Sequence, residues 1–165
     1  MAHPPIPRAT WLALLLVTCI GCDQATKSLA TQTLGQEPDQ VHSYLGDTIR
    51  LQYALNPGAF LGMGKNLAPR ERFAILVLTN SLTMLALAVV LARNWQMARL
   101  KLIAGALILS GGIGNLIDRI SNAGLVTDFM NVGIGPLRTG IFNVADMAIM
   151  AGCGLYLWTW WRDDH

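Results

Sequence analysis

Apolar residues in this chain form four long blocks that are separated by more polar segments. The blocks cover residues 9–29, 73–92, 102–117 and 141–161. Each is close to the roughly 20 residues that a helix needs to cross about 30 Å of hydrocarbon. The pattern predicts four transmembrane helices. A basic residue precedes the first block, as in a signal peptide, but three further apolar blocks follow, so we interpret it as a retained span.

Two of the segments between the blocks differ from simple loops. Residues 48–55 alternate polar and apolar side chains, which is the period of a strand with one buried face. Val126, Phe129 and Val132 give apolar content to the segment between the third and fourth blocks. We expect both segments to join in a small extended platform at the membrane surface. The third block is the shortest and is rich in glycine, so we expect its outer end to lie in a polar pocket.

The composition supports a membrane protein. Of the 165 residues, 53% are hydrophobic and only 13% are charged, whereas soluble proteins average about 25% charged residues. The net charge of +2 is too small to indicate a nucleic-acid partner, and none is expected. Basic residues gather before the first block, between the second and third, and after the fourth. This distribution predicts cytoplasmic termini and places the connections 30–72 and 118–140 outside.

Ionisable groups near apolar spans are costly, so each needs a reason. Asp23 and Lys27 are four residues apart in the first block, which places them on one helical face where they can pair. Their role is open between a stabilising ion pair and a part in positioning substrate. Asp118 directly precedes Arg119, and we interpret it as the ion-pair partner of that arginine.

Two carboxylates are candidates for chemistry. Asp146 lies about five residues into the fourth block, with Asn143 three residues before it, and Asp128 lies in the apolar stretch 125–129. If both reach the same edge of the membrane they share one proton, because close like charges do not both ionise cheaply. One carboxylate then takes a proton from water while the other donates to a carbonyl oxygen, as in aspartic peptidases.

A different class of function is a proton-coupled transporter that uses Asp23, Asp128 and Asp146 as a relay. Against it, these acids cluster near one predicted face, and a relay needs polar stations across the bilayer. The glycines of residues 110–114 lack the spacing of a nucleotide-binding loop, so we assign them to close helix packing. The three histidines are scattered, and a hard cation would need more oxygens than two carboxylates offer. We expect no metal and no cofactor.

Four motifs in order resemble those of the lipoprotein signal peptidase family, also called signal peptidase II. The chain reads D-Q-A-T-K at residues 23–27, G-G-I-G-N-L-I-D-R at 111–119, V-T-D-F at 126–129 and F-N-V-A-D at 142–146. The likeness extends over nearly the whole chain. It implies one membrane peptidase domain over residues 1–165, mainly α-helical, with four transmembrane helices, a small extracytoplasmic β-platform and a short surface helix.

The resemblance also implies an activity and a site. Asp128 and Asp146 correspond to the catalytic pair, and four residues correspond to polar positions that hold substrate or order the site: Asn56, Asn115, Arg119 and Asn143. The implied substrate is a prolipoprotein held in the bacterial inner membrane and cut before its diacylglyceryl cysteine, with water as nucleophile and no metal. Membrane lipid is the other expected partner, and we expect a monomer with its active site at the extracytoplasmic face.

One stretch departs from the family pattern. The family commonly reads N-T-G-A-A-F, whereas this chain reads N-P-G-A-F-L at residues 56–61. Proline fixes its own φ and restricts the residue before it. We therefore expect the loop that follows Asn56 to have its own shape, while the two catalytic positions are unaffected.

Overall fold

The computed structural model describes residues 7–58 and 68–163, which form four helices and four strands. In chain order the elements are α1 (Arg8–Thr33), β1 (His42–Tyr44), β2 (Ile49–Asn56), α2 (Pro69–Arg93), α3 (Arg99–Ser121), β3 (Val126–Ile134), β4 (Leu137–Arg138) and α4 (Val144–Asp163). Each of the four apolar blocks therefore forms a helix, although α4 begins at Val144, three residues into the fourth block. A short surface helix is not among the elements of the described residues.

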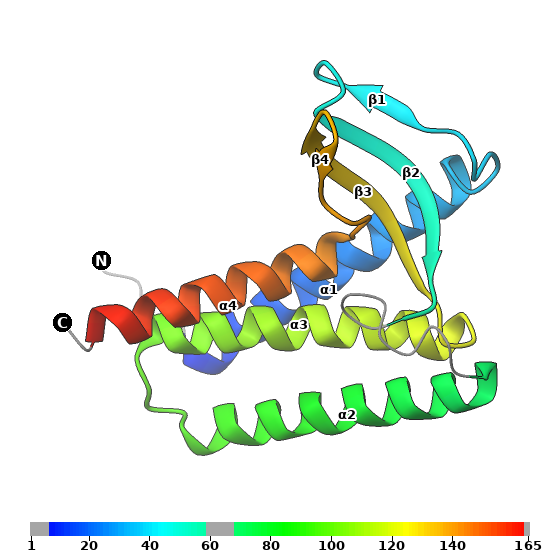
Figure 1. The fold of residues 1–165 in the computed structure, drawn as a ribbon. Coiled ribbons are helices and arrows are strands. Elements are labelled where there is room, and N and C mark those ends of the chain that lie inside the picture. The colour runs from blue at the N-terminus through cyan, green and yellow to red at the C-terminus, as the bar shows by residue number, and fades with distance from the viewer. Residues whose placement is uncertain (1–6, 59–67, 164–165) are drawn as a thin grey trace.

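The helices form an antiparallel bundle around α3, which packs against each of the other three. Successive helices alternate in direction, so α1 begins and α4 ends at the same end of the bundle (Figure 1). A buried apolar cluster lies near that end and centres on Leu12, Leu102 and Ala106. The opposite end, where α1 and α3 finish and α4 begins, carries the sheet. We call it the sheet end.

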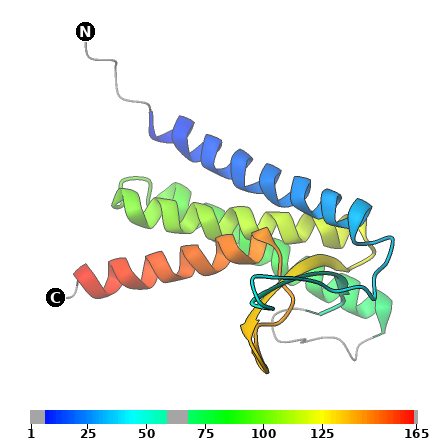
Figure 2. The ribbon, with the colours of Figure 1, turned by 90° about the horizontal axis from the view of Figure 1, so that it is seen from above.

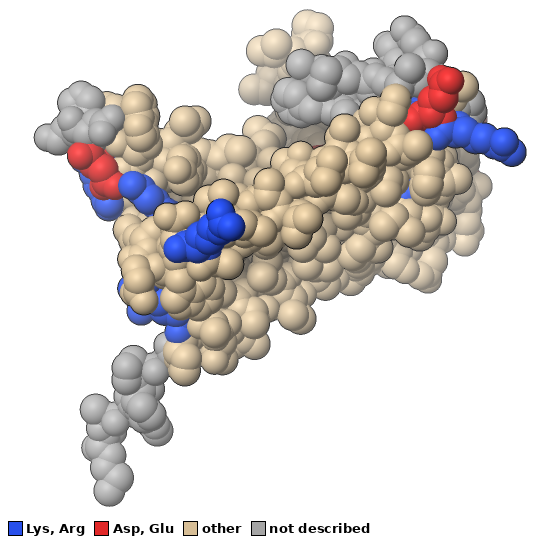
Figure 3. Space-filling view, turned by 90° about the horizontal axis from the view of Figure 1, so that it is seen from below, with Lys and Arg blue, Asp and Glu red and all other residues tan. Residues whose placement is uncertain are grey.

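Three of the helices are long and apolar enough to cross a membrane by themselves, namely Arg8–Thr33, Arg70–Arg93 and Arg99–Ser121. The helix α4 has 20 residues, with Asp146 in its first turn and three tryptophans in its last two turns. On the face shown in Figure 3, charged side chains lie at the two ends of the molecule and leave an uncharged band between them. This distribution is the one that a bilayer selects.

The third apolar block is the shortest of the four, but the helix that contains it is not. The helix α3 has 23 residues and continues through Asn115, Asp118 and Arg119, whereas α4 is the shortest at 20. The helix extends because these polar side chains are buried and find partners inside the protein. The expectation that its outer end lies in a polar environment is confirmed.

The strands form one antiparallel sheet in the order β1-β2-β3-β4. The strand β2 coincides with the alternating segment, and it pairs with β3 so that Asn56 lies opposite Val126 and Ala54 opposite Asp128. The predicted extended platform is therefore confirmed as a sheet. Figure 2 shows it at the sheet end, beside the helices and not between them.

Glycines allow α3 to approach its neighbours closely, as the sequence predicts. A methyl group on Gly111 would collide with the backbone oxygen of Ala145 and lie 2.7 Å from Cγ1 of Ile149, both in α4. A methyl group on Gly114 would lie 2.5 Å from Oδ2 of Asp23 in α1. The helix contacts that position the site thus depend on the absence of side chains at these positions.

We expect Gly111→Ala to destabilise the protein by about 1–3 kcal/mol, because the contact is with backbone that has no rotamer to escape into. Thermal unfolding of the detergent-purified protein measures this change. Gly21→Ala is the matched control, since a methyl group there meets nothing within 4 Å and alanine is the better helix former. Equal melting temperatures for the two variants would contradict the packing role of Gly111.

Candidate active site

The first turn of α4 is fixed by a reciprocal pair of hydrogen bonds. The backbone N–H of Asp146 donates to Oδ1 of Asn143 at 2.9 Å, and the backbone N–H of Asn143 donates to Oδ2 of Asp146 at 3.2 Å. This is the arrangement of a capping box, in which two unpaired donors at a helix start are satisfied together. Asp146 is therefore in the first turn of α4, and the prediction that it lies about five residues into the span was wrong.

Asp128 lies on β3 and is only 2% exposed. The amide Nδ2 of Asn56, at the end of the neighbouring strand, donates to its Oδ2 at 2.9 Å. The amide Nδ2 of Asn143 donates to its Oδ1 at 2.6 Å. Both carboxyl oxygens are thus held by side-chain amides, one from the sheet and one from the start of α4.

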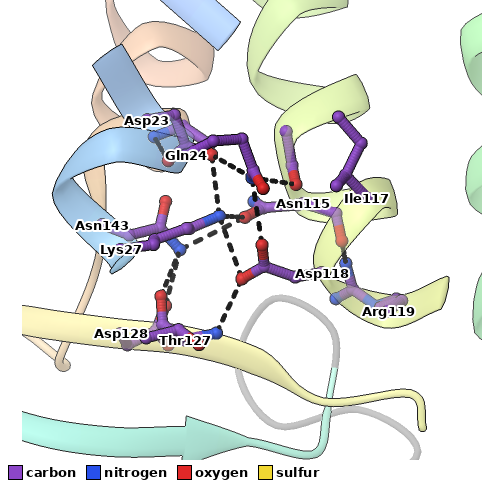
Figure 4. Close-up of polar contacts among 12 residues, drawn as sticks. Asp23, Gln24, Lys27, Asn115, Ile117, Asp118, Arg119, Thr127, Asp128 and Asn143 are labelled. Carbon is purple, nitrogen blue, oxygen red and sulfur yellow. Dashed lines mark hydrogen bonds and ion pairs between the residues drawn. The ribbon is translucent and has the colours of Figure 1, made fainter. Parts of the chain in front are cut away.

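Asn115 links the two carboxyl groups. Its Nδ2 donates to Oδ1 of Asp146 at 2.9 Å, and its Oδ1 accepts from Nδ2 of Asn143 at 3.2 Å. Since the same Nδ2 of Asn143 also donates to Asp128, a chain of two amides connects Asp128 to Asp146. Figure 4 shows the part of this chain that runs from Asp128 through Asn143 to Asn115. The structure therefore brings together the two acids that the sequence singled out. Asp128 lies on a strand and Asp146 on a helix, and the two residues are 18 positions apart in the sequence.

Lys27 supports this arrangement from α1. Its Nζ lies 2.9 Å from Oδ2 of Asp23 and 3.2 Å from Oδ2 of Asp118, and it donates to Oδ1 of Asn115 at 3.0 Å. All four side chains are buried. The predicted Asp23–Lys27 pair is confirmed, and Asp23 also accepts from the backbone N–H of Ala145 at 2.8 Å, which joins α1 to the start of α4.

The interpretation of Asp118 as the partner of Arg119 was wrong. Asp118 pairs with Lys27 and accepts from the backbone N–H of Thr127 at 2.9 Å. Arg119 instead donates to the backbone oxygens of Asn115 and Gly58, each at 3.2 Å. Adjacent residues on a helix do not face each other, so the two side chains diverge. Arg119 is 8% exposed, and its Nε has no hydrogen-bond partner within the described ranges.

Two residues of the network had no predicted role. Gln24 donates to the carboxylates of Asp23 and Asp118 at 3.1 and 3.0 Å, and Thr127 accepts from Asn143 at 3.3 Å through its backbone oxygen. Gln24 follows Asp23 within the first motif, and a glutamine inside an apolar block was the signal that could have identified it. The role of Thr127 is carried by its backbone, so its residue type gave no such signal.

The departure from the family pattern after Asn56 is resolved in part. Oδ1 of Asn56 accepts from the backbone N–H of Gly58 at 3.0 Å, which closes a short turn across Pro57. The same asparagine uses its Nδ2 for Asp128. The turn therefore fixes which amide atom faces the carboxyl group. The rest of the departing stretch, from residue 59, lies outside the described residues.

The environment of Asp128 favours its protonated form. Burial raises the pKa of Asp128 to about 6, from an ordinary value of 3.8. The negative charge of Asp146 also raises this pKa, whereas hydrogen bonds from Asn56 and Asn143 and the charge of Lys27 lower it. The net effect favours a proton on Asp128 at mildly acidic pH.

We expect the melting temperature of the protein to fall between about pH 4 and pH 6 through the titration of Asp128. The pKa of Asp128 in the folded protein exceeds its value of 3.8 in the unfolded chain. The stabilisation that comes from holding this proton is therefore fully present below the unfolded pKa and is lost as pH rises through about 6. Asp128→Asn should have a flatter profile over this range. Comparing slopes cancels the pH-independent cost of altered hydrogen bonds, and equal slopes would contradict the raised pKa.

Within the described residues, no group of three or more His, Cys, Asp or Glu side chains is placed to hold a metal ion. The chemical groups at the site are two carboxyl groups, three amides and a guanidinium. Such groups can share a proton, orient a water molecule and donate hydrogen bonds to a peptide carbonyl. They match an acid–base hydrolysis without a nucleophilic side chain.

Comparisons with known proteins agree on one family. The family model described as signal peptidase II matches residues 15–162. A lipoprotein signal peptidase of Chlorobium luteolum is 38% identical over 154 residues, which cover 88% of this chain and 88% of the relative. The lipoprotein signal peptidase of Hydrogenovibrio crunogenus is 34% identical over 161 residues, which cover 94% of this chain and 87% of the relative.

The fold is also that of a solved protein. A bacterial membrane enzyme superposes on this chain with a TM-score of 0.81 at 23% sequence identity, and the match covers 99% of this chain and 94% of the other. The family match, over residues 15–162, spans all four motifs that the sequence displays. This chain is a member of the signal peptidase II family.

Proposed function

We propose that this protein removes the signal peptide from diacylglyceryl-modified bacterial prolipoproteins by cutting before the lipidated cysteine. The observation that carries the proposal is a pair of carboxyl groups, Asp128 and Asp146, joined by amides at one end of an apolar helix bundle. The relatives named above are lipoprotein signal peptidases. A substrate held in the bilayer by acyl chains would present its peptide at the level of these two carboxyl groups.

In the proposed mechanism the pair holds one proton. The ionised carboxylate takes a proton from water as the oxygen attacks the scissile carbonyl carbon, and the other carboxyl group donates its proton to the carbonyl oxygen. The tetrahedral intermediate then collapses. One of its hydroxyl groups returns a proton to the ionised carboxylate, the C–N bond breaks, and the amine nitrogen takes the proton of the other carboxyl group. No metal or cofactor takes part in these steps.

The remaining site residues have supporting roles in this proposal. Asn56, Asn115 and Asn143 orient the two carboxyl groups through the hydrogen bonds described above. Asp23 and Lys27 hold Asn115 and the start of α4. Arg119 is buried, and its Nε has no hydrogen-bond partner among residues 7–58 and 68–163; it is the group that offers a donor to a backbone carbonyl of the substrate.

The proposal includes a membrane arrangement. All four helices span the bacterial inner membrane as one domain over residues 1–165, with both termini in the cytoplasm and the site at the extracytoplasmic face. Tryptophans at the end of α4, Trp158, Trp160 and Trp161, suit the membrane interface. The protein acts as a monomer on a prolipoprotein and is surrounded by lipid.

We expect purified protein to cleave a diacylglyceryl-modified prolipoprotein and to leave its unlipidated form intact, because only the acyl chains hold the peptide at the depth of the site. Product analysis by mass measures both reactions. Chelator is the control and should leave the rate unchanged. Equal cleavage of the two forms would contradict the role of the lipid, and loss of activity in chelator with recovery on adding one metal would contradict the metal-free mechanism.

A further inference from the structure

The most exposed large apolar side chains of the described residues are not on the helices. They are Leu137, Ile134 and Leu45, which are 83%, 79% and 76% exposed. Leu45 lies in the turn that joins β1 to β2, and Ile134 and Leu137 are the strand residues on either side of the turn that joins β3 to β4. We call these three residues the apolar tip. Proteins rarely expose a group of large apolar side chains to water unless the group contacts a partner or a membrane.

The backbone presents these side chains at a cost. Leu45, Gly46 and Asp47 have φ values of 52°, 62° and 70°, and the left-handed region is unfavourable for leucine. The strained turn leaves Leu45 exposed. Ile134 and Leu137 are direct partners across β3 and β4, so both point to one face of that hairpin.

The two turns form one unit. The backbone N–H of Gly133 donates to the oxygen of Thr48 at 2.9 Å, and Nη1 of Arg138 donates to the backbone oxygen of Asp47 at 2.7 Å. Arg50 and Arg138 both pair with the Asp47 carboxylate. This cluster of two arginines and one aspartate carries one net positive charge directly behind the apolar tip.

The apolar tip lies at the level where the helix α4 begins. Figures 1 and 2 both show the two turns level with the start of α4, well short of the ends of α1 and α3 along the length of the bundle. The helices α1 and α3 have 26 and 23 residues, more than the roughly 20 needed to cross the hydrocarbon core. Their ends therefore extend past it, whereas α4 begins near its boundary. The exposed side chains of Met147 and Met150 follow the start of α4. They therefore lie level with the two turns or nearer the middle of the bundle.

We propose that the apolar tip inserts into the lipid leaflet at the sheet end, with Arg50 and Arg138 at the level of the lipid phosphates. Apolar side chains backed by positive charge are the pattern of an interfacial anchor. A second copy of this chain is the weaker candidate, because three side chains fall well short of the roughly 800 Å² that each partner buries in a stable interface. The proposal rests on the membrane-spanning arrangement proposed above.

The anchor has a consequence for the site. The strands β2 and β3 lead from the apolar tip to Asn56 and Asp128, so lipid that holds one end of the sheet restrains the position of the other. The sheet is thus attached at both ends, through the site network and through the bilayer.

The test measures how deep the apolar tip lies in the lipid, and not cleavage. The anchor can therefore be disproved while the proposed peptidase activity stands. The three cysteines, Cys19, Cys22 and Cys153, are replaced with alanine, and Leu137→Cys is labelled with a fluorophore in vesicles of phosphatidylethanolamine and phosphatidylglycerol. Asp39→Cys is the matched control in the connection before β1, and labels at Asn94 and Asn122 report the sides of the membrane. Retained cleavage of lipidated substrate verifies each protein.

We expect nitroxide attached near the glycerol backbone of the lipid to quench the label at position 137 at least threefold more than the label at position 39. Iodide in the water should show the opposite order. Equal iodide quenching at both positions would overturn the proposal, as would protection at position 137 that disappears on dilution of the protein at fixed lipid. Labels at Asn94 and Asn122 on one side would refute the spanning arrangement instead, and this anchor with it.

Discussion

Replacing either Asp128 or Asp146 with asparagine is expected to lower cleavage by roughly a thousandfold or more, to the limit of detection. The amide has nearly the volume of the carboxyl group but does not exchange a proton with water. If the two residues act in one chemical step, the double variant should be scarcely slower than either single variant, because effects within one catalytic unit are not additive. Single-turnover cleavage of lipidated substrate measures all three.

Folding must be separated from chemistry in this experiment, because asparagine at position 128 would face the amides of Asn56 and Asn143. Melting temperature and reporter topology establish that each variant is folded and inserted. Asp39→Asn, an exposed carboxylate in the connection before β1, is the control for the substitution itself. Substantial turnover by a folded Asp128→Asn or Asp146→Asn protein would exclude the catalytic pair and favour the proton-coupled transporter.

The second large effect is expected from Lys27→Met. Lys27 is the only cation paired with both Asp23 and Asp118 among the described residues. Removing it leaves two buried carboxylates without a counter-charge, and breaking a buried pair in this way typically costs about 3–5 kcal/mol. We expect a large fall in melting temperature and loss of cleavage, since Asn115 loses one of the donors that fix its amide.

Lys101→Met provides the matched control. Lys101 also makes an ion pair, with Asp163 at 2.8 Å, but the two side chains are 30% and 39% exposed, and pairs of that kind contribute about 0–1 kcal/mol. A rescue arm strengthens the test: adding Asp118→Asn to Lys27→Met removes one unpaired charge and should restore part of the lost stability. If Lys27→Met and Lys101→Met melt alike, the buried cluster has no structural role.

Much of the fold follows from periodicity. Apolar blocks of about 20 residues predicted the four helices, since every backbone group inside lipid must be paired within its own segment. The alternation of residues 48–55 predicted β2 as well, because alternation is the period of a strand, although nearly all side chains of β2 are half-buried in the structure. Helix ends were less accurate. The helix α3 runs past its apolar block to Ser121, because polar side chains there are buried against other elements.

Local spacing also accounts for part of the site. Spacing along one helix predicted the Asp23–Lys27 pair, because residues four apart share a face whatever the rest of the chain does. The same rule, applied to neighbours, should have excluded an Asp118–Arg119 pair. The capping role of Asn143 and Asp146 was local as well, although their spacing was interpreted only as a shared helical face.

The sequence by itself determined the apolar helices, the strand and the identity of the acidic residues, because these depend on contacts within one segment. Only the tertiary structure decided which acids meet. Asp128 reaches the start of α4 because β3 pairs with β2 in a register that places Ala54 opposite it. Lys27 faces Asp118 and Asn115 because glycines let α1, α3 and α4 approach closely. Such contacts join residues up to 122 positions apart, and their geometry is fixed by packing between elements, which no local pattern encodes.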